Sequence, residues 1–349
     1  MGLKKTLSLC MIAKNEEVFL DAAIKSARSV LGVDDIVIAD TGSTDMTKEI
    51  AADNGAAVFD FVWCDDFSAA RNFASDKAAN DWVFVLDADE EVMGADIDEL
   101  EKFLTGDQVV GSVSRVELSD KASTYESRVY NRKHYRYEGR VHEQITPLGN
   151  NKKSIEPVPI RIAHYGYLPE FERVNLKLER NEKLLKIELE EHPDDPYLLH
   201  QLGKCYFCNN RDLARACICF ESALMSAPDV RIGYVYDMVE CYGYALLNTG
   251  QYDKALKLRD DYAKYYESNP HFRFLSAHIY QNNGLLIEAV ECFERCIGAD
   301  TVDYKGITSF LSYYNIGVIL ECVGMVEDAV EMYKNCGDYE PAKKRLAVL

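Results

Sequence analysis

Short apolar runs alternate with helical patterns along the first half of the chain. Four runs rich in β-branched and aromatic residues predict buried strands: LSLCMIA (7–13), DIVIAD (35–40), AAVFDF (56–61) and DWVFVLDA (81–88). The segments between them have apolar positions at helical spacing, which predicts helices near residues 16–30, 44–54 and 67–79. Residues 109–165 are again rich in strand patterns. We therefore predict an α/β domain over residues 1–170, with a mainly parallel sheet covered on both faces.

Beyond residue 170 the pattern becomes helical and repeats. Four alanines occupy one equivalent position, separated by 39, 34 and 40 residues: Ala216, Ala255, Ala289 and Ala329. The copies share a small residue in the first helix (Gly203, Gly243, Ala277, Gly317), and the last three share a turn glycine (Gly250, Gly284, Gly324). Helix hairpins that bury their apolar stripe only by stacking explain this spacing. The copies resemble tetratricopeptide repeats, so we predict an all-α repeat domain at 196–349 after a helical linker at 171–195.

Composition narrows the classes of function. The chain has 349 residues, 48% of them hydrophobic, which is enough for two cores. A net charge of −19 argues against nucleic acid or an anionic membrane as a partner. No apolar stretch approaches the length of a membrane span. The 11 cysteines are irregularly spaced and the N-terminal apolar run is too short for a signal peptide, so we expect a reduced, cytoplasmic protein.

The strand in WVFVLDADEE runs directly into a cluster of acids. Ligands of open parallel sheets bind beyond the carboxyl ends of the strands, and Asp87, Ala88 and Asp89 place two carboxylates there, on the same side. Their mutual repulsion suggests a bound cation such as Mg²⁺ or Mn²⁺ that shares its oxygen ligands with a diphosphate. The alternative is an acidic turn. An EF-hand is excluded because Val92 occupies the position of its obligatory glycine.

Two further strands also end in polar residues. One strand ends in Asp40 and turns at Gly42, and Ser43 can then cap the next helix. A glycine turn at a helix N-terminus suits a nucleotide, and Asp40 could accept a hydrogen bond from a base or a ribose. The first strand leads from Ala13 into Lys14, Asn15 and Glu16. Each feature alone is common in α/β domains, but three polar strand ends at one edge favour a nucleotide site.

Five segments together resemble the family 2 glycosyltransferases of the GT-A fold, which is Rossmann-like: CMIAKNEE, VIADTGSTDMT, DDFSAARNFA, VFVLDADEEV and RYEGRVHEQI. The resemblance covers about residues 5–167. With the helical repeats, the chain is similar to the branch that contains the SunS-type peptide glycosyltransferases. The resemblance implies a nucleotide-sugar donor, usually a UDP-sugar, held with a divalent metal by a DxD motif, and transfer with inversion at the anomeric carbon.

The resemblance also implies roles for individual residues. Asp89 would be the metal ligand and Asp87 a ribose or supporting partner, while Asp40 would recognise the uracil. Arg71 would reach the base or the diphosphate, with an ordinary surface arginine as the alternative. The implied donor-binding set is Ala13, Lys14, Asn15, Glu16, Asp40, Gly42, Ser43, Arg71, Asp87, Ala88 and Asp89. Near the end of the domain, His164 would complete the metal site with Asp87 and Asp89, although a lone histidine can also be a core residue.

Inverting transfer needs a base that takes a proton from the acceptor. The segment YEGRVHEQI offers Glu138, His142 and Glu143. If residues 141–145 are extended, His142 and Glu143 point to opposite faces, so both cannot face the sugar. We choose Glu143 as the base and keep Glu138 and His142 as alternatives.

The acceptor is the least constrained part of the prediction. Helical repeats suit an extended peptide, so we expect a peptide or protein side chain bound near the repeats, with a lipid-linked or lipopolysaccharide sugar as the alternative. The repeats could also bind a second copy of the chain, or only support the first domain. A different class of protein is an interaction scaffold with an inactive nucleotide-sugar fold. A nucleotidyltransferase or phosphotransferase is disfavoured because no Walker-type GKS or GKT loop is present.

Overall fold

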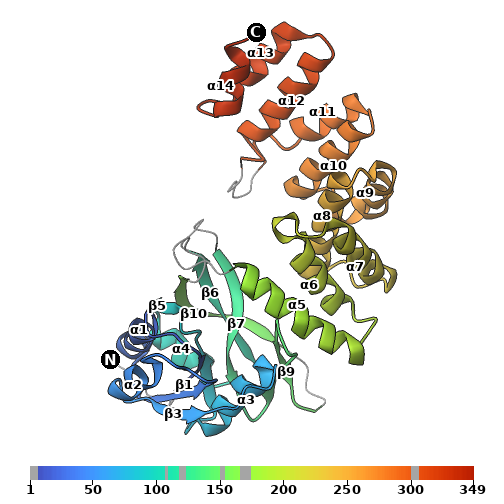
Figure 1. The fold of residues 1–349 in the computed structure, drawn as a ribbon. Coiled ribbons are helices and arrows are strands. Elements are labelled where there is room, and N and C mark those ends of the chain that lie inside the picture. The colour runs from blue at the N-terminus through green and yellow to red at the C-terminus, as the bar shows by residue number, and fades with distance from the viewer. Residues whose placement is uncertain (1–6, 107–108, 118–122, 150–153, 166–173, 300–305) are drawn as a thin grey trace. The chain divides into compact units, whose positions relative to one another are not determined.

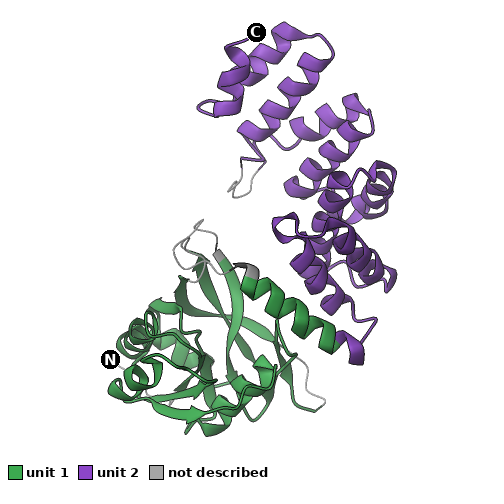
Figure 2. Ribbon diagram, in the orientation of Figure 1, with its two compact units in different colours: residues 1–188 green, residues 189–349 purple. Residues whose placement is uncertain are grey.

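The computed structural model describes residues 7–106, 109–117, 123–149, 154–165, 174–299 and 306–349. The chain divides into two compact units, residues 1–188 and 189–349 (Figure 2). The predicted domain boundary at residue 170 lies outside the described residues. The predicted linker segment contains helix α5 (Val174–Glu191), most of which belongs to the first unit.

The first unit is built on a mixed eight-stranded sheet of order β3-β2-β1-β4-β7-β6-β10-β5 (Figure 1). The first four strands are mutually parallel, and β6 is parallel to β10, whereas β7 and β5 run antiparallel to their neighbours. The strands are β1 (Leu7–Ala13), β2 (Asp35–Asp40), β3 (Ala57–Asp60), β4 (Trp82–Val85), β5 (Glu90–Ala95), β6 (Val110–Glu117), β7 (Ser123–Asn131) and β10 (Ile155–His164). The predicted α/β architecture is confirmed.

Side chains that alternate along the strands form two cores, one on each face of the sheet. On one face, Leu9 and Met11 of β1 pack with α1 (Leu20–Leu31), α2 (Thr47–Asp53) and α4 (Ile97–Phe103). On the other face, Cys10 of β1 packs with α3 (Phe67–Lys77) and with the small sheet of β8 (Tyr135–Glu138) and β9 (Gln144–Pro147). The buried strands therefore have little freedom to slip in register, which fixes the positions of their ends.

Helix α1 begins at Leu20, later than the sequence pattern predicts. Asn15 has a left-handed backbone (φ 57°), and the residues after it form a turn in which Glu16 O accepts from the N–H groups of Phe19 and Leu20. The segment between β1 and α1 is therefore a loop, with its side chains at the carboxyl edge of the sheet.

The second unit consists of stacked helix hairpins, as predicted. Small residues allow close helix contacts: a Cβ atom at Gly203 would lie 2.5 Å from Phe220, and one at Gly317 would lie 2.7 Å from Tyr333. The helices are α6 (Pro196–Phe207), α7 (Leu213–Met225), α8 (Gly233–Asn248), α9 (Tyr252–Tyr266), α10 (Pro270–Asn282), α11 (Leu286–Glu294), α12 (Phe310–Cys322), α13 (Val326–Lys334) and α14 (Glu340–Leu346). Among the described residues, no helix combines the length and apolar character needed to cross a bilayer.

Candidate active site

Three neighbouring strands bring the polar strand ends together. Strand β1 lies between β2 and β4 and runs parallel to both, and Ala13 pairs with Asp40. The loop after β4, which carries Asp87 and Asp89, begins with a hydrogen bond from Leu86 N to Cys10 O. The carboxyl ends of the strands therefore meet at one edge, as the sequence predicts.

The loops after β1 and β2 are hydrogen-bonded to each other. Asn15 N donates to Ser43 Oγ (3.0 Å), Thr44 N donates to Asn15 Oδ1 (2.8 Å), and Glu16 N donates to Thr47 Oγ1 (2.8 Å). Asn15 and Ser43 thus use polar groups to fix this corner. Lys14 is exposed, whereas Ala13 is buried in the strand. The cross-bonding gives the loops a defined shape before any ligand binds.

Asp40 is buried and only partly satisfied. Its Oδ1 atom accepts from the N–H groups of Gly42 and Ser43, both at 3.0 Å, which stabilises a turn where Gly42 has φ 105°. Burial alone would raise the pKa of Asp40, but these hydrogen bonds and Lys48 outweigh it and lower the pKa. The buried Oδ2 atom has no hydrogen-bond partner within the described structure. A buried acceptor of this kind normally has a donor, such as a ligand N–H or a water molecule.

Asp87 is bound by two buried arginines. Its carboxylate accepts from Arg71 Nη2 (2.8 Å) and Arg128 Nη2 (3.0 Å). Burial acts to raise the pKa of Asp87, but the two guanidinium groups outweigh it and hold the pKa well below its usual value. Arg71 is 8% exposed, so it is not a surface arginine. Its Nε atom donates to Glu143 Oε1 (2.5 Å), so one guanidinium joins two carboxylates predicted to have different roles.

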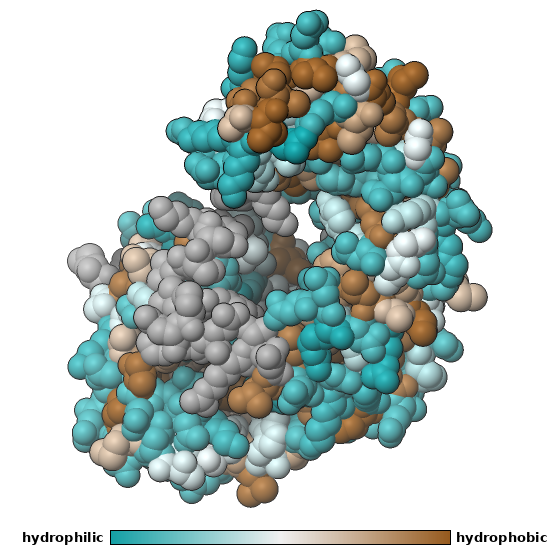
Figure 3. Space-filling model, turned by 45° about the horizontal axis from the view of Figure 1, so that its top comes forward, coloured by the Kyte–Doolittle hydropathy of each residue, from teal (hydrophilic) through white to brown (hydrophobic). Residues whose placement is uncertain are grey.

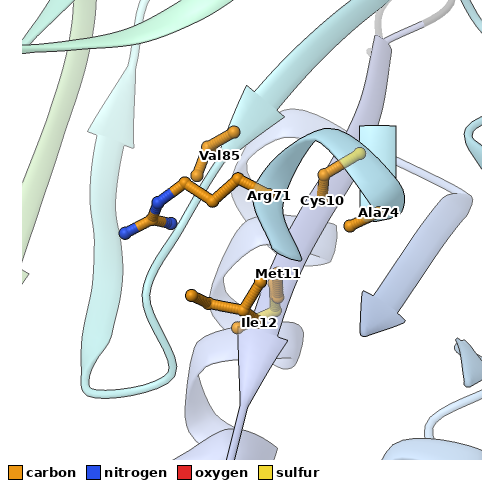
Figure 4. A pocket seen from close by; sticks show the side chains of 6 residues that line it. All are labelled: Cys10, Met11, Ile12, Arg71, Ala74 and Val85. Atoms are coloured by element: carbon orange, nitrogen blue, oxygen red, sulfur yellow. The ribbon is translucent and has the colours of Figure 1, made fainter. Parts of the chain in front are cut away.

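The stem of Arg71 lies over a narrow crevice between β1, β4 and α3. The crevice is lined by Cys10, Met11, Ile12, Arg71, Ala74 and Val85, and it has no room for a water molecule, so it cannot hold a nucleotide (Figure 4). Figure 4 shows the guanidinium directed away from the apolar lining. The ring of Tyr137 lies 5.5 Å from the guanidinium carbon. The arginine is therefore held along its length, and its charge is presented to the carboxylates.

Asp89 pairs with His164 at the end of β10. His164 Nε2 lies 3.2 Å from Asp89 Oδ2, and its Nδ1 lies 2.9 Å from Glu117 Oε2. Burial alone would lower the pKa of His164, but the hydrogen bonds to the two carboxylates outweigh it and raise the pKa. The structure thus brings together two of the predicted metal ligands. The third, Asp87, is engaged by arginines, and Ala88 between the two aspartates is buried.

Glu16 lies in the field of both aspartates. Burial raises the pKa of Glu16 to about 7, with further contributions from the negative charges of Asp89 and Asp87. An acid with a raised pKa beside other acids is typical of a site that takes a positive charge or a proton.

The three candidate bases have different environments. Residues 141–143 are not extended: strand β9 begins at Gln144, and His142 has a left-handed backbone (φ 55°), so the expectation of a strand over 141–145 is wrong for its first part. Glu143 is pulled inward by Arg71, with its side chain 11% exposed. Glu138 is exposed and follows Tyr137 in β8, so it points away from the face where Tyr137 packs on Arg71. Through Arg71, the geometry links Glu143 to Asp87, and Glu138 does not share this link.

A buried ionic network that the sequence did not predict connects the two aspartates. Arg128 binds Asp87 and Glu90, and Arg115 binds Glu90 and Glu117, which holds His164. Both arginines also bind Glu126. The available signal was the spacing of charges two residues apart in SVSRVEL and TYESRVYN, which places them on one face of each strand. Charges on a covered face of a sheet are rare unless paired, so this pattern indicates a built network.

Parts of the chain are similar to known proteins. Residues 8–156 match the model described as glycosyl transferase family 2, and residues 270–303 match a tetratricopeptide repeat. A TPR repeat-containing protein of Synechococcus elongatus is 35% identical over 209 residues, 56% of this chain and 51% of that protein. An uncharacterized glycosyltransferase of Rickettsia typhi is 37% identical over 97 residues, 28% of this chain and 32% of that protein.

A more distant relative is the SPbeta prophage-derived glycosyltransferase SunS of Bacillus subtilis, which is 25% identical over 215 residues, 57% of this chain and 49% of that protein. The matched region thus spans about half the length of two of these relatives and about a third of the other. Residues 8–156 are therefore similar to glycosyltransferase family 2, and the all-helical region that follows contains a match to a tetratricopeptide repeat.

Proposed function

We propose that this protein is a metal-dependent inverting glycosyltransferase that uses a nucleotide-sugar, most simply a UDP-sugar, as its donor. The observation that carries the proposal is the ionic cluster at the carboxyl edge of the sheet. It contains six carboxylates (Asp87, Asp89, Glu90, Glu117, Glu126, Glu143) and four basic groups, three guanidinium groups (Arg71, Arg115, Arg128) and the imidazole of His164. The excess of negative charge beside a turn that suits a nucleotide supports a site for a cation and a diphosphate.

Asp89 and His164 are the residues that would hold the ion, Mn²⁺ or Mg²⁺. Their facing ligand atoms are 3.2 Å apart, and Glu117 orients the second nitrogen of His164, as second-layer carboxylates do in metal sites. Within the described part of the chain, no group of three or more His, Cys, Asp or Glu side chains is arranged to hold a metal ion. An ion held by this pair would need its other ligands from phosphate and water, and it would neutralise the departing diphosphate.

Manganese affinity should increase with pH. Glu16 has a pKa of about 7, so it gains its negative charge between pH 6 and 8. The imidazole of His164, whose pKa is raised, also loses its proton as the pH rises. We expect Mn²⁺ to bind about ten-fold more tightly at pH 8 than at pH 6, measured by calorimetric titration without donor. Glu16→Gln should retain only the weaker dependence due to His164. A wild-type affinity that is the same at both pH values would contradict this assignment.

Glu143 is the proposed base. The hydroxyl or thiol of the acceptor attacks the anomeric carbon, the bond from that carbon to the diphosphate oxygen breaks, and the proton of the nucleophile passes to Glu143. The Arg71 guanidinium donates to Glu143 and fixes the position of one of its oxygens. The Oδ2 atom of Asp40, which has no hydrogen-bond partner in the described structure, is the proposed acceptor for an imide N–H of the donor's nucleobase.

We further propose a peptide or protein side chain as acceptor, bound near the helical repeats. The face in Figure 3 shows apolar patches on the helical unit among hydrophilic residues. Exposed apolar side chains of this unit include Ile218, Met225, Ile287 and Val323. With a net charge of −19, these surfaces favour a basic peptide with apolar residues. A cytoplasmic location and a homodimer through the repeats stay predictions.

The test of the proposed function is donor hydrolysis. The protein is incubated with UDP-glucose and Mn²⁺ without acceptor, and released UDP is measured, with GDP- and dTDP-sugars as parallel donors. Slow release that stops with a chelator supports the transferase. Absence of release from every donor, together with donor binding that does not depend on metal, would favour the scaffold with an inactive domain. A panel of basic peptides and a lipid-linked sugar, added to the active donor, identifies the acceptor class by faster release.

A further inference from the structure

The loop that carries Glu143 needs support from outside itself. Residues 139–143 connect β8 to β9 and contain two left-handed positions, Gly139 (φ 100°) and His142 (φ 55°). A left-handed backbone is uncommon for residues other than glycine, although histidine adopts it more readily than most, and such positions are held by their surroundings. The position of the proposed base therefore depends on contacts made to this loop.

Three contacts hold the loop in place. Arg71 binds the Glu143 side chain, and Phe67 N, in the first turn of α3, donates to Arg140 O (2.9 Å). The third comes from α5: Arg140 N donates to Glu188 Oε2 (2.9 Å). The other Glu188 oxygen, Oε1, would lie 3.6 Å from a Cβ atom at Gly139, so the carboxylate sits directly against the start of the loop.

Helix α5 also contacts the elements next to the loop. Lys183 forms an ion pair with Asp65 (2.7 Å), and the guanidinium of Arg180 lies 4.8 Å from the ring centre of Phe67. Glu188, Arg180 and Lys183 thus all face the corner formed by the start of α3 and the loop. The helix continues beyond Glu188 to Glu191, into the helical unit.

We propose that Glu188 is a positioning residue for the base: its carboxylate holds the backbone of Arg140 so that Glu143 stays at the donor site. This rests on the proposed function, with Glu143 as the base. Through its hydrogen bond from Arg140 N, Glu188 acts on the chemistry by way of the loop. A hydrogen bond from a backbone N–H to a charged acceptor is stronger than a neutral one, and it is directional.

The test compares Glu188→Ala and Glu188→Gln in the full chain, using the acceptor-independent UDP release assay. We expect Glu188→Ala to lower kcat by roughly 10- to 100-fold, with the KM for the donor within about two-fold of wild type, because small displacements of a catalytic group cost rate but not donor binding. Glu188→Gln keeps an acceptor oxygen and should retain most of the rate. Glu179→Ala, an exposed position on the same helix, is the matched control and should leave kcat unchanged.

A double-mutant cycle separates positioning from general destabilisation. If Glu188 acts only through Glu143, then Glu188→Ala should have little further effect on kcat in a Glu143→Gln background. The proposal would be overturned if the effects of Glu188→Ala and Glu143→Gln on the activation free energy were fully additive. It would also be overturned if Glu188→Ala kept wild-type kcat, or if it lowered the melting temperature and raised the donor KM. If the wild-type protein releases no UDP, or if Glu143→Gln is fully active, the proposed function or its base has failed instead. The outcomes for the two claims are therefore distinct.

Discussion

Replacement of Asp89 by alanine is expected to lower metal-dependent turnover by about 10³-fold or more, because it removes the carboxylate proposed to hold the ion. The variant removes the contact between Asp89 Oδ2 and His164 Nε2, but His164 keeps its hydrogen bond to Glu117 through Nδ1. The backbone of Asp89 accepts from Tyr165 N, and alanine keeps this contact. The fold should therefore survive the change, and the measurement is UDP release with and without Mn²⁺.

Asp98→Ala is a suitable control for this variant. Asp98 is exposed in the first turn of α4, so its removal changes the net charge by the same amount without reaching the cluster. We expect its turnover to equal that of wild type. The melting curve of Asp89→Ala, followed by circular dichroism, should overlap that of the wild-type protein. Wild-type turnover in Asp89→Ala would remove the metal assignment and with it the proposed role of His164.

The two aspartates of the DAD motif have different electrostatic environments. Asp87 is neutralised by Arg71 and Arg128, so its negative charge needs no ion to be stable. Among the described residues, Asp89 pairs with His164, and its negative charge is one of the causes that raise the pKa of Glu16. The repulsion inferred from the sequence is thus relieved by two guanidinium groups at Asp87 and by the imidazole of His164 at Asp89. This difference supports Asp89 as the ion ligand, whereas Asp87 helps to position Arg71.

Much of the fold could be predicted from the sequence because its signals are local. The apolar runs of β1 and β2 have the predicted bounds, and the period of the alanines located the helix hairpins. The start of α1 was missed because hydrogen bonds between residues 15–17 and 43–47 hold the preceding segment as a loop. Those contacts join segments about 28 residues apart, and no local pattern encodes them.

The candidate site was predictable only where strand ends carry its residues. Asp40, Asp87 and Asp89 follow buried strands, so their place at the sheet edge followed from the pattern. Arg71 was assigned to the nucleotide, but in the structure it binds Glu143 across 72 residues of sequence. Arg128 and Glu117 were not predicted because each binds a residue that is distant in the sequence. Arg128 binds Asp87 and Glu117 binds His164, and only the order of the strands in the sheet brings these residues together. The order of strands in a mixed sheet is a property of the whole fold.

Replacement of Glu143 by glutamine is expected to slow transfer by about 10²- to 10⁴-fold while donor binding is retained. The amide has nearly the same shape, and its oxygen can still accept from Arg71 Nε, so the guanidinium keeps its place between residues 143 and 87. What is lost is the ability to take a proton. The measurements are the rate of UDP release and the dissociation constant of UDP with Mn²⁺, which should stay within about two-fold of wild type because no proposed donor contact changes.

Glu138→Gln is the matched control, because Glu138 lies in the same segment but points away from Arg71. It should keep wild-type turnover. If Glu138→Gln is slow and Glu143→Gln is fast, the base is Glu138 and the loop must rearrange when donor binds. If both are fast and His142→Ala is slow, the imidazole is the base. A loss of UDP binding in Glu143→Gln would mean that Glu143 supports the donor site through Arg71 and Asp87, since that guanidinium is the direct link between the two carboxylates.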